Sequence, residues 1–170
     1  VSYLISQRMD DPNMYVWPEL DAGGPIDHHI DAPPGEVTLF ATAREYARCR
    51  VQGQGSAKRS PFDAADDLER LADEIDAHLK TLADMPGLEE SVEYRVVRVD
   101  FAALSALARY HAAKSRAAGH LALFYAVGER HNLDDAEDAA AQAVDLWEAL
   151  CERTAPFYDR LHLGPSGGHW

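Results

Sequence analysis

The sequence predicts an all-α fold, an up-down helical bundle of three long helices plus a shorter one, preceded by an irregular segment rich in proline and glycine. Two observations indicate this class. Apolar residues recur at three-to-four spacing over long stretches, as they do on one face of a helix. Helix-start signals stand just before those stretches. Long amphipathic helices joined by short turns must bury their apolar stripes against each other, and a bundle achieves this.

The irregular segment covers residues 1–35. The runs "SYLI" (Ser2–Ile5) and "MYVW" (Met14–Trp17) have the composition of short strands and are separated by the turn-rich "DDPN". Residues 18–35 are rich in Pro, Gly and Asp without any period, which predicts a loop. We therefore expect a docking loop over 1–35 and a helical bundle domain over 36–170.

The first two helices of the bundle have clear start signals. "TARE" (Thr42–Glu45) matches a capping box and predicts a short helix that ends near Val51, before "GQGS". "SPFD" (Ser60–Asp63) supplies an N-cap, a proline at the first helical position and an early carboxylate. The helix that follows is expected to stop at Pro86-Gly87.

A third, longer helix is expected from Leu88 to about Arg130. The β-branched residues of 96–99 predict a bend or break near its start. Asn132 or Asp134 is the expected N-cap of the last helix. That helix is expected to end before Pro156 and to carry the following residues inward: Ala140, Val144, Trp147, Leu150 and Cys151.

Charge excludes two classes of partner. The chain has 29 acidic and 16 basic residues, a formal net charge of −13. This charge repels phosphate backbones and anionic lipid, so we expect no nucleic acid and no membrane among its partners. The sequence also contains no run of about 18 apolar residues, so it predicts no transmembrane helix.

The two cysteines, Cys49 and Cys151, lie far apart in predicted helices. Buried free thiols are the expected state, and a single bridge between them is the alternative, which would indicate an exported protein. The compartment stays open between cytoplasmic and secreted. The chain starts at Val1 and ends in "GPSGGHW", which favours a piece of a longer protein.

A first candidate site lies in the irregular segment. Trp17 offers a flat apolar face, and the nearby carboxylate of Glu19 accepts hydrogen bonds from hydroxyls, a combination that suits a sugar ring. Asp21 is placed in the same candidate ligand site. The alternative is that Trp17 folds onto the bundle as a large apolar plug, as most large aromatic side chains do.

The same segment contains a set of possible metal ligands. Asp27, His28, His29 and Asp31 supply carboxylate and imidazole donors within a few residues. Adjacent histidines in a loop point in different directions, and a metal site usually needs ligands from elsewhere in the fold. We therefore predict no bound metal and no cofactor, and keep this cluster only as part of an alternative.

A second candidate site lies on the long third helix. It is drawn from Arg109, Tyr110, His111, Lys114, Arg116 and His120, of which Arg109, His111 and Lys114 are the predicted ligand-binding residues. His111 and Lys114 fall on helical stripes that are otherwise apolar. In the functional interpretation His111 carries a proton while Lys114 or Arg109 grips an anion or sugar hydroxyls. In the alternative, the two cations reach solvent or a carboxylate of another helix, and His111 bonds a carbonyl.

Several stretches together resemble a helical region of large bacterial carbohydrate-active proteins of glycoside-hydrolase type: "WPELDAGGPIDHHIDAPPGE", "SPFDAADDLERLADEI", "ARYHAAKSRAAGHLALF" and "LHLGPSGGHW". In such proteins a helical segment follows a catalytic or sandwich domain. The resemblance implies that the catalytic carboxylates lie outside this chain. It carries no catalytic residue onto it.

Two hypotheses follow. In the first, the chain is a non-catalytic accessory domain of a carbohydrate-processing protein, possibly a glycoside hydrolase, that packs on its catalytic neighbour and contributes Trp17 and Glu19 to glycan binding. In the second, it is a small helical-bundle enzyme or metal-binding module that uses His111 and Lys114 or the Asp27–His29 cluster. The second hypothesis requires an enclosed polar pocket that contains His111, or three or more metal ligands in one place.

Overall fold

The computed structural model describes residues 26–157, with the side chain of His28 excepted. The predicted all-α bundle is confirmed, while the strands predicted within Ser2–Ile5 and Met14–Trp17 lie outside the described residues. The elements in chain order are α2 (Asp27–Asp31), α3 (Ala43–Val51), α4 (Pro61–Ala83), the 3₁₀ turn η2 (Leu88–Glu90), α5 (Val92–Val127) and α6 (Arg130–Thr154).

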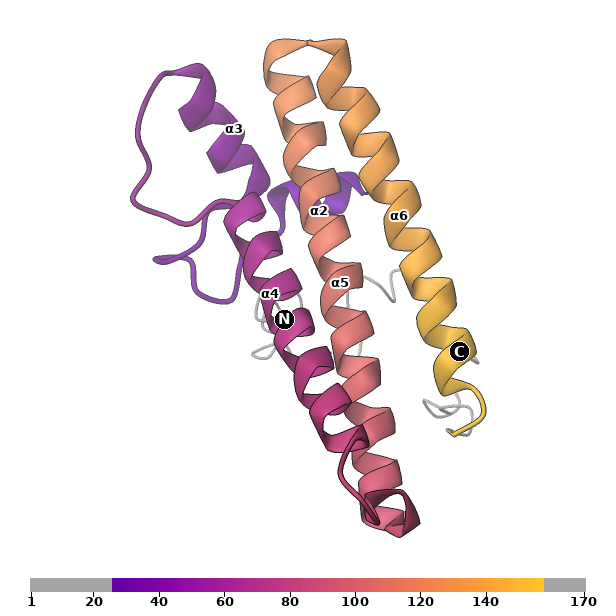
Figure 1. Cartoon of the computed structure of the whole chain (residues 1–170). Helices are drawn as coiled ribbons and strands as arrows, with labels where there is room; N and C mark the ends of the chain where they lie inside the picture. The colour runs from indigo at the N-terminus through magenta and orange to yellow at the C-terminus, as the bar shows by residue number, and fades with distance from the viewer. Residues whose placement is uncertain (1–25, 158–170) are drawn as a thin grey trace, which may run out of the picture.

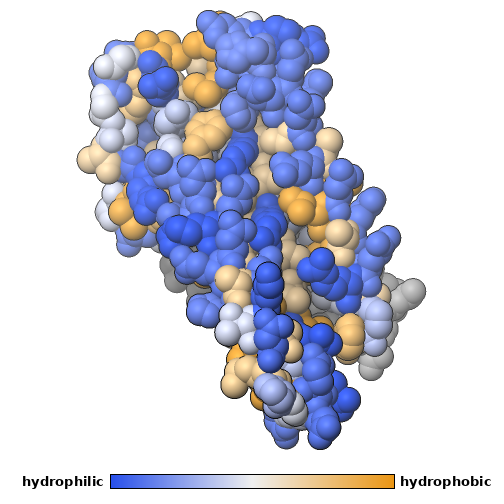
Figure 2. Space-filling view, in the orientation of Figure 1, coloured by the Kyte–Doolittle hydropathy of each residue, from blue (hydrophilic) through white to orange (hydrophobic). Residues whose placement is uncertain are grey.

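The long helices α4, α5 and α6 run side by side, with α5 in the middle (Figure 1). Within the described residues, α4 and α6 both pack along α5 and make no extensive contact with each other. The short helices α2 and α3 pack on α5 toward the end where it turns into α6. The opposite ends of α4 and α5 extend past the end of α6. Hydrophilic side chains dominate the face of the molecule shown in Figure 2.

The predicted starts of α3 and α4 agree with the structure. Ser60 and Asp63 form a complete capping box, because the Ser60 hydroxyl accepts from the Asp63 amide and the Asp63 carboxylate accepts from the Ser60 amide. Only half of the predicted box is present at α3. Thr42 accepts from the Glu45 amide, but the Glu45 carboxylate accepts from Lys58, at 2.9 Å, instead of reaching back.

Helix α5 differs from the prediction at its start. It begins at Val92, after the 3₁₀ turn, because Ser91 caps it by accepting from the Tyr94 amide at 3.2 Å. It then runs unbroken through residues 96–99, so the predicted break is wrong. Each valine costs a helix only a few tenths of a kcal/mol, which is too little to interrupt a helix of 36 residues.

The turn between α5 and α6 is tighter than predicted. Gly128 adopts a left-handed conformation (φ 73°), and its amide donates to the Phe124 carbonyl at 2.7 Å. The chain reverses at once, and α6 starts after Glu129. The prediction of Asn132 or Asp134 as N-cap is therefore wrong, since both lie inside the first turns of α6.

The buried core is made largely of alanine, which lets helix backbones approach closely. One cluster joins α2, α3, α5 and α6, and a second joins α4 to α5. The first contains Ile30, Ala43, Ala47, Ala118, Leu121, Ala122 and Ala136, and the second contains Ala65, Leu68, Ala72, Ala108 and Ala112.

Part of the predicted inward face of α6 points outward. Leu150 is buried and Ala140 half-buried, but Val144 is 57% exposed, Trp147 43% exposed, and Cys151 is exposed. Helix α6 packs on α5 through a row of smaller residues instead: Ala136, Ala139, Ala143 and Leu150. The larger apolar residues lie on the neighbouring edge of the helix, so their inward placement was wrong.

Residues 27–31 form one turn of helix where the sequence predicts only loop. The turn is held by its contacts with the bundle. Ile30 is 1% exposed and His29 5% exposed. Burial of these two side chains stabilises a turn that has no side-chain cap and is too short to form alone.

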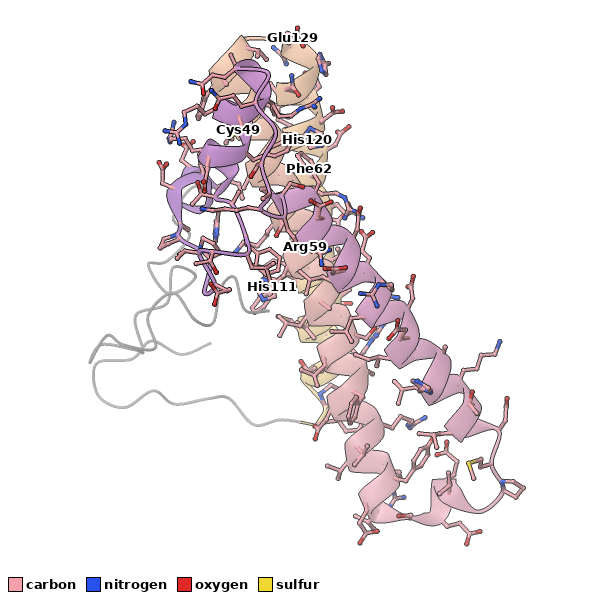
Figure 3. All side chains as sticks on the ribbon, turned by 90° about the vertical axis from the view of Figure 1, so that its left-hand side faces the viewer. Cys49, Arg59, Phe62, His111, His120 and Glu129 are labelled. Carbon is pink, nitrogen blue, oxygen red and sulfur yellow. The ribbon has the colours of Figure 1, made fainter. Side chains whose placement is uncertain are left out.

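We predict that Gly119→Val destabilises the fold. A Cβ at Gly119 would lie 2.7 Å from Cζ of Phe62, whose ring is wedged between Tyr46 and His120 (Figure 3). Overpacking of this kind costs about 1–3 kcal/mol, more than the helix gains by losing a glycine. Urea denaturation followed by circular dichroism measures the loss. The substitution should cost less in a Phe62→Leu background, and equal costs in both backgrounds would contradict the steric explanation.

Candidate functional site

The residues of the predicted site on α5 point in different directions. Arg109 faces α4, where its Nη2 lies 2.8 Å from Asp73 Oδ1 and 2.8 Å from Asp76 Oδ2. It also donates to the hydroxyl of Ser105, which in turn donates to Asp76 at 2.7 Å. Arg109 therefore joins two helices through carboxylates, the partner type that the sequence suggests for it.

A second arginine of the same candidate group, Arg116, repeats this arrangement two turns further along α5. Arg116 Nη1 lies 2.6 Å from Glu69 Oε1, and its Nη2 lies 2.7 Å from Asp66 Oδ1 and 2.9 Å from Glu69 Oε2. The seven-residue spacing from Arg109, matched by acidic residues along α4, is the signal that could have revealed the pair of bridges.

His111 lies on another side of α5. It is 8% exposed, and burial, followed by the charge of Lys114, lowers its pKa to about 3. The imidazole is thus neutral at pH 7. In the part of the chain that the structure describes, its Nδ1 is buried without a hydrogen-bond partner. Figure 3 shows His111 projecting from the edge of α5 that lies away from α4.

Tyr110 and Lys114 lie toward α6. The ring of Tyr110 has its centroid 5.0 Å from that of Trp147 and 4.9 Å from that of His111. The ammonium of Lys114 sits 5.0 Å from the Tyr110 ring centroid, within range of a cation–π interaction. Lys114 is half-buried.

These contacts separate the predicted site residues. Residues two apart on a helix do not face each other, so Arg109 and His111 point to different neighbours. Arg109 is held by two carboxylates of α4, Lys114 lies over the Tyr110 ring of α5, and His111 is buried near His29 of α2. The structure does not bring the three together around one space.

The Asp27–Asp31 cluster makes contacts that fix α2 to the bundle. Asp27 accepts a hydrogen bond from the Tyr125 hydroxyl at 2.8 Å, which raises the pKa of Tyr125. Asp31 forms a bidentate ion pair with Arg44, one branch of which is 2.8 Å long, and this pair lowers the pKa of Asp31. Among the described residues, no three His, Cys, Asp or Glu side chains come close enough to hold a metal ion.

A hollow of about 260 Å³ opens between α3 and α5. Its lining includes Arg44, Arg48 and Tyr125 around a floor of alanines. None of the predicted site residues on α5 takes part in this lining. The hollow is therefore not the polar pocket around His111 that an enzyme of the second hypothesis requires.

The remaining predicted residues cannot be placed beside these. Trp17, Glu19 and Asp21 lie outside the described residues, as does the side chain of His28. Both cysteines are free thiols, with Cys49 half-buried and Cys151 exposed.

Comparisons with protein-family models, with curated proteins and with solved structures found no match to this chain. Of the helices within 26–157, none combines the length and apolar character needed to cross a membrane. The class that the fold defines is thus an acidic all-α helical bundle whose charged residues tie its helices together.

We predict that Arg116→Met lowers the free energy of unfolding by about 0.5–1 kcal/mol, a value that allows for solvent screening of its partly exposed partners. Urea denaturation measures it. The loss should shrink in a Glu69→Gln, Asp66→Asn background, and it should fall in high salt. A loss unchanged in that background would mean that packing of the Arg116 stem, and not the ion pair, stabilises the bundle.

The low pKa of His111 predicts that the stability of the fold depends on pH. Its pKa of about 3 in the folded protein lies below its unfolded value of about 6.5. The unfolded chain therefore binds a proton that the folded chain does not, and stability falls as the pH drops from about 6.5 toward 3. At pH 5 the loss due to His111 is about 2 kcal/mol.

The test compares the protein with His111→Phe, which keeps a ring but cannot titrate. Denaturation at pH 7 and pH 5 should show a smaller loss of stability in the variant. The same loss in both proteins would show that other groups cause the acid sensitivity.

Proposed function

We propose that the chain is a non-catalytic helical domain of a larger carbohydrate-processing protein, where it packs on a catalytic neighbour and contributes Trp17, Glu19 and Asp21 to glycan binding. One observation carries the non-catalytic part of this proposal. Arg109, one of the two cations expected to grip a substrate on α5, is held by carboxylates of α4, with contacts of 2.8 Å to both Asp73 and Asp76.

The chemistry of His111 supports the same conclusion. A general base works best with a pKa near the operating pH. The pKa of His111 is about 3, so its imidazole is a weak base at neutral pH. Its nearest cation, Lys114, is held against the Tyr110 ring. A small enzyme that uses His111 and Lys114, the alternative function, would need both groups in different surroundings.

The tip of the bundle supports packing on a neighbour. Where α4 and α5 extend past α6, Met85, Val92 and Val96 are each at least 50% exposed. Apolar side chains gathered at one end of a bundle are typical of a surface that meets another domain. The resemblance to helical regions of glycoside-hydrolase-type proteins favours a catalytic domain as that neighbour.

The glycan part is tested by titrating the protein with soluble glycans while following tryptophan fluorescence. We expect saturable quenching that is lost in Trp17→Ala, because the indole supplies the stacking face. Trp147→Phe is the matched control: it removes another tryptophan, on α6, and should keep the binding. A flat response to every glycan, or quenching that survives in Trp17→Ala, would refute a glycan site at Trp17.

A further inference from the structure

One side of the helical layer is only partly covered. Residues seven apart on α5 lie two turns apart on one face. Leu104, His111 and Ala118 form one such row. Ala118 packs in the core cluster with Ile30 of α2, and His111 is also buried. Leu104, two turns before His111, is 51% exposed. Cover by α2 therefore ends between His111 and Leu104.

Helix α6 shows the same change along its length. Leu133 packs against the core cluster that contains Ile30, whereas Trp147, four turns later on the same side, is 43% exposed. The contact of Trp147 with Tyr110 places it level with the last covered turn of α5. We call this surface the uncovered face. It consists of Val97, Phe101 and Leu104 of α5 with Val144, Trp147 and Cys151 of α6, all of them exposed.

An independent observation lies at the upper end of the uncovered face. The His111 imidazole is more than nine-tenths buried, and its Nδ1 has no hydrogen-bond partner within the described part of the chain. A neutral imidazole has one N–H and one acceptor nitrogen, and leaving either unpaired when buried is costly. The segment that covers the face must therefore offer a polar group to His111 as well as apolar side chains to Leu104 and Trp147.

We propose that the chain's own first 25 residues are this segment. The chain enters α2 at Ile26, which packs against the core cluster beside the uncovered face. Met14 and Val16 stand only about ten residues upstream, a length that spans up to roughly 33 Å. The stretch of α5 from Phe101 to His111 rises about 15 Å. A tethered segment of this length reaches the whole face at a high effective concentration.

The run Met14–Trp17 has the pattern that such a face needs. In an extended chain, alternate side chains point to opposite sides. Met14 and Val16 then pack against the uncovered face, backbone amides or carbonyls of the segment reach His111, and Tyr15 and Trp17 face outward. This arrangement is compatible with the glycan role proposed for Trp17, but does not rest on it. A second copy of the chain is a poorer occupant, since each copy carries a net charge of −13.

A double-mutant cycle in the full chain tests the proposal. The two changes are Met14→Asp with Val16→Asp in the segment, and Leu104→Asp on the uncovered face. Each should lower the Tm by about 3–6 °C. Combined, they should lower it no further than the larger of the two, because residues in contact share one interaction. Leu71→Asp on α4 is the matched control, since Leu71 is also exposed (43%), and its effect should add to that of the segment change.

Three results would overturn the proposal. The segment change could leave the Tm as it is, or its effect could add fully to that of Leu104→Asp. Light scattering could also show a dimer that Leu104→Asp dissociates, which would assign the face to a second copy. None of these results depends on glycan binding. A coupled cycle in a protein whose fluorescence does not respond to glycans would support this inference and refute the glycan site. An additive cycle together with saturable quenching that is lost in Trp17→Ala would do the opposite.

Discussion

The close approach of other helices to α5 is the constraint on which the rest of the structure depends. Along its second half α5 presents small residues to its neighbours, including Ala112, Ala118 and Gly119, all buried. With so little side-chain volume, α3, α4 and α6 can all pack on one helix, and Phe62 of α4 can occupy the space above Gly119. Small side chains bury little apolar area each. The polar bridges between helices therefore contribute a larger share of the stability of the layer.

Those bridges explain how so acidic a chain keeps its helices together. Helix α4 carries carboxylates on the side next to α5, where Arg109 and Arg116 meet them. A bidentate guanidinium fixes the register of two helices more firmly than an apolar alanine contact can, because its hydrogen bonds have direction. The two arginines therefore fix the register between α4 and α5. While they bind these carboxylates, they cannot bind a ligand at the same time.

The sequence predicts elements well where a start or stop has its own chemistry, as at Ser60–Asp63. The prediction fails where contacts between helices, and not local sequence, determine the structure. The turn at Asp27–Asp31 forms because Ile30 and His29 find a buried place on α5, which no local pattern reveals. The inward residues of α6 were misassigned because two neighbouring stripes are apolar, and periodicity alone cannot tell which one meets α5. Arg109, His111 and Lys114 are close in sequence, but their spacing places them on different sides of α5.

A layer of helices needs a second layer to bury its face. In the described chain, α2 and α3 provide that layer over one half of α5 only, and the cover stops next to a buried imidazole with an unpaired nitrogen. An apolar face alone would accept many occupants, but His111 adds a polar requirement that a backbone amide or carbonyl can meet. If the chain's own start covers this face, Trp17 is presented from a rigid support, as binding residues on loops usually are. The same contact would then complete the core and orient the segment proposed to bind glycans.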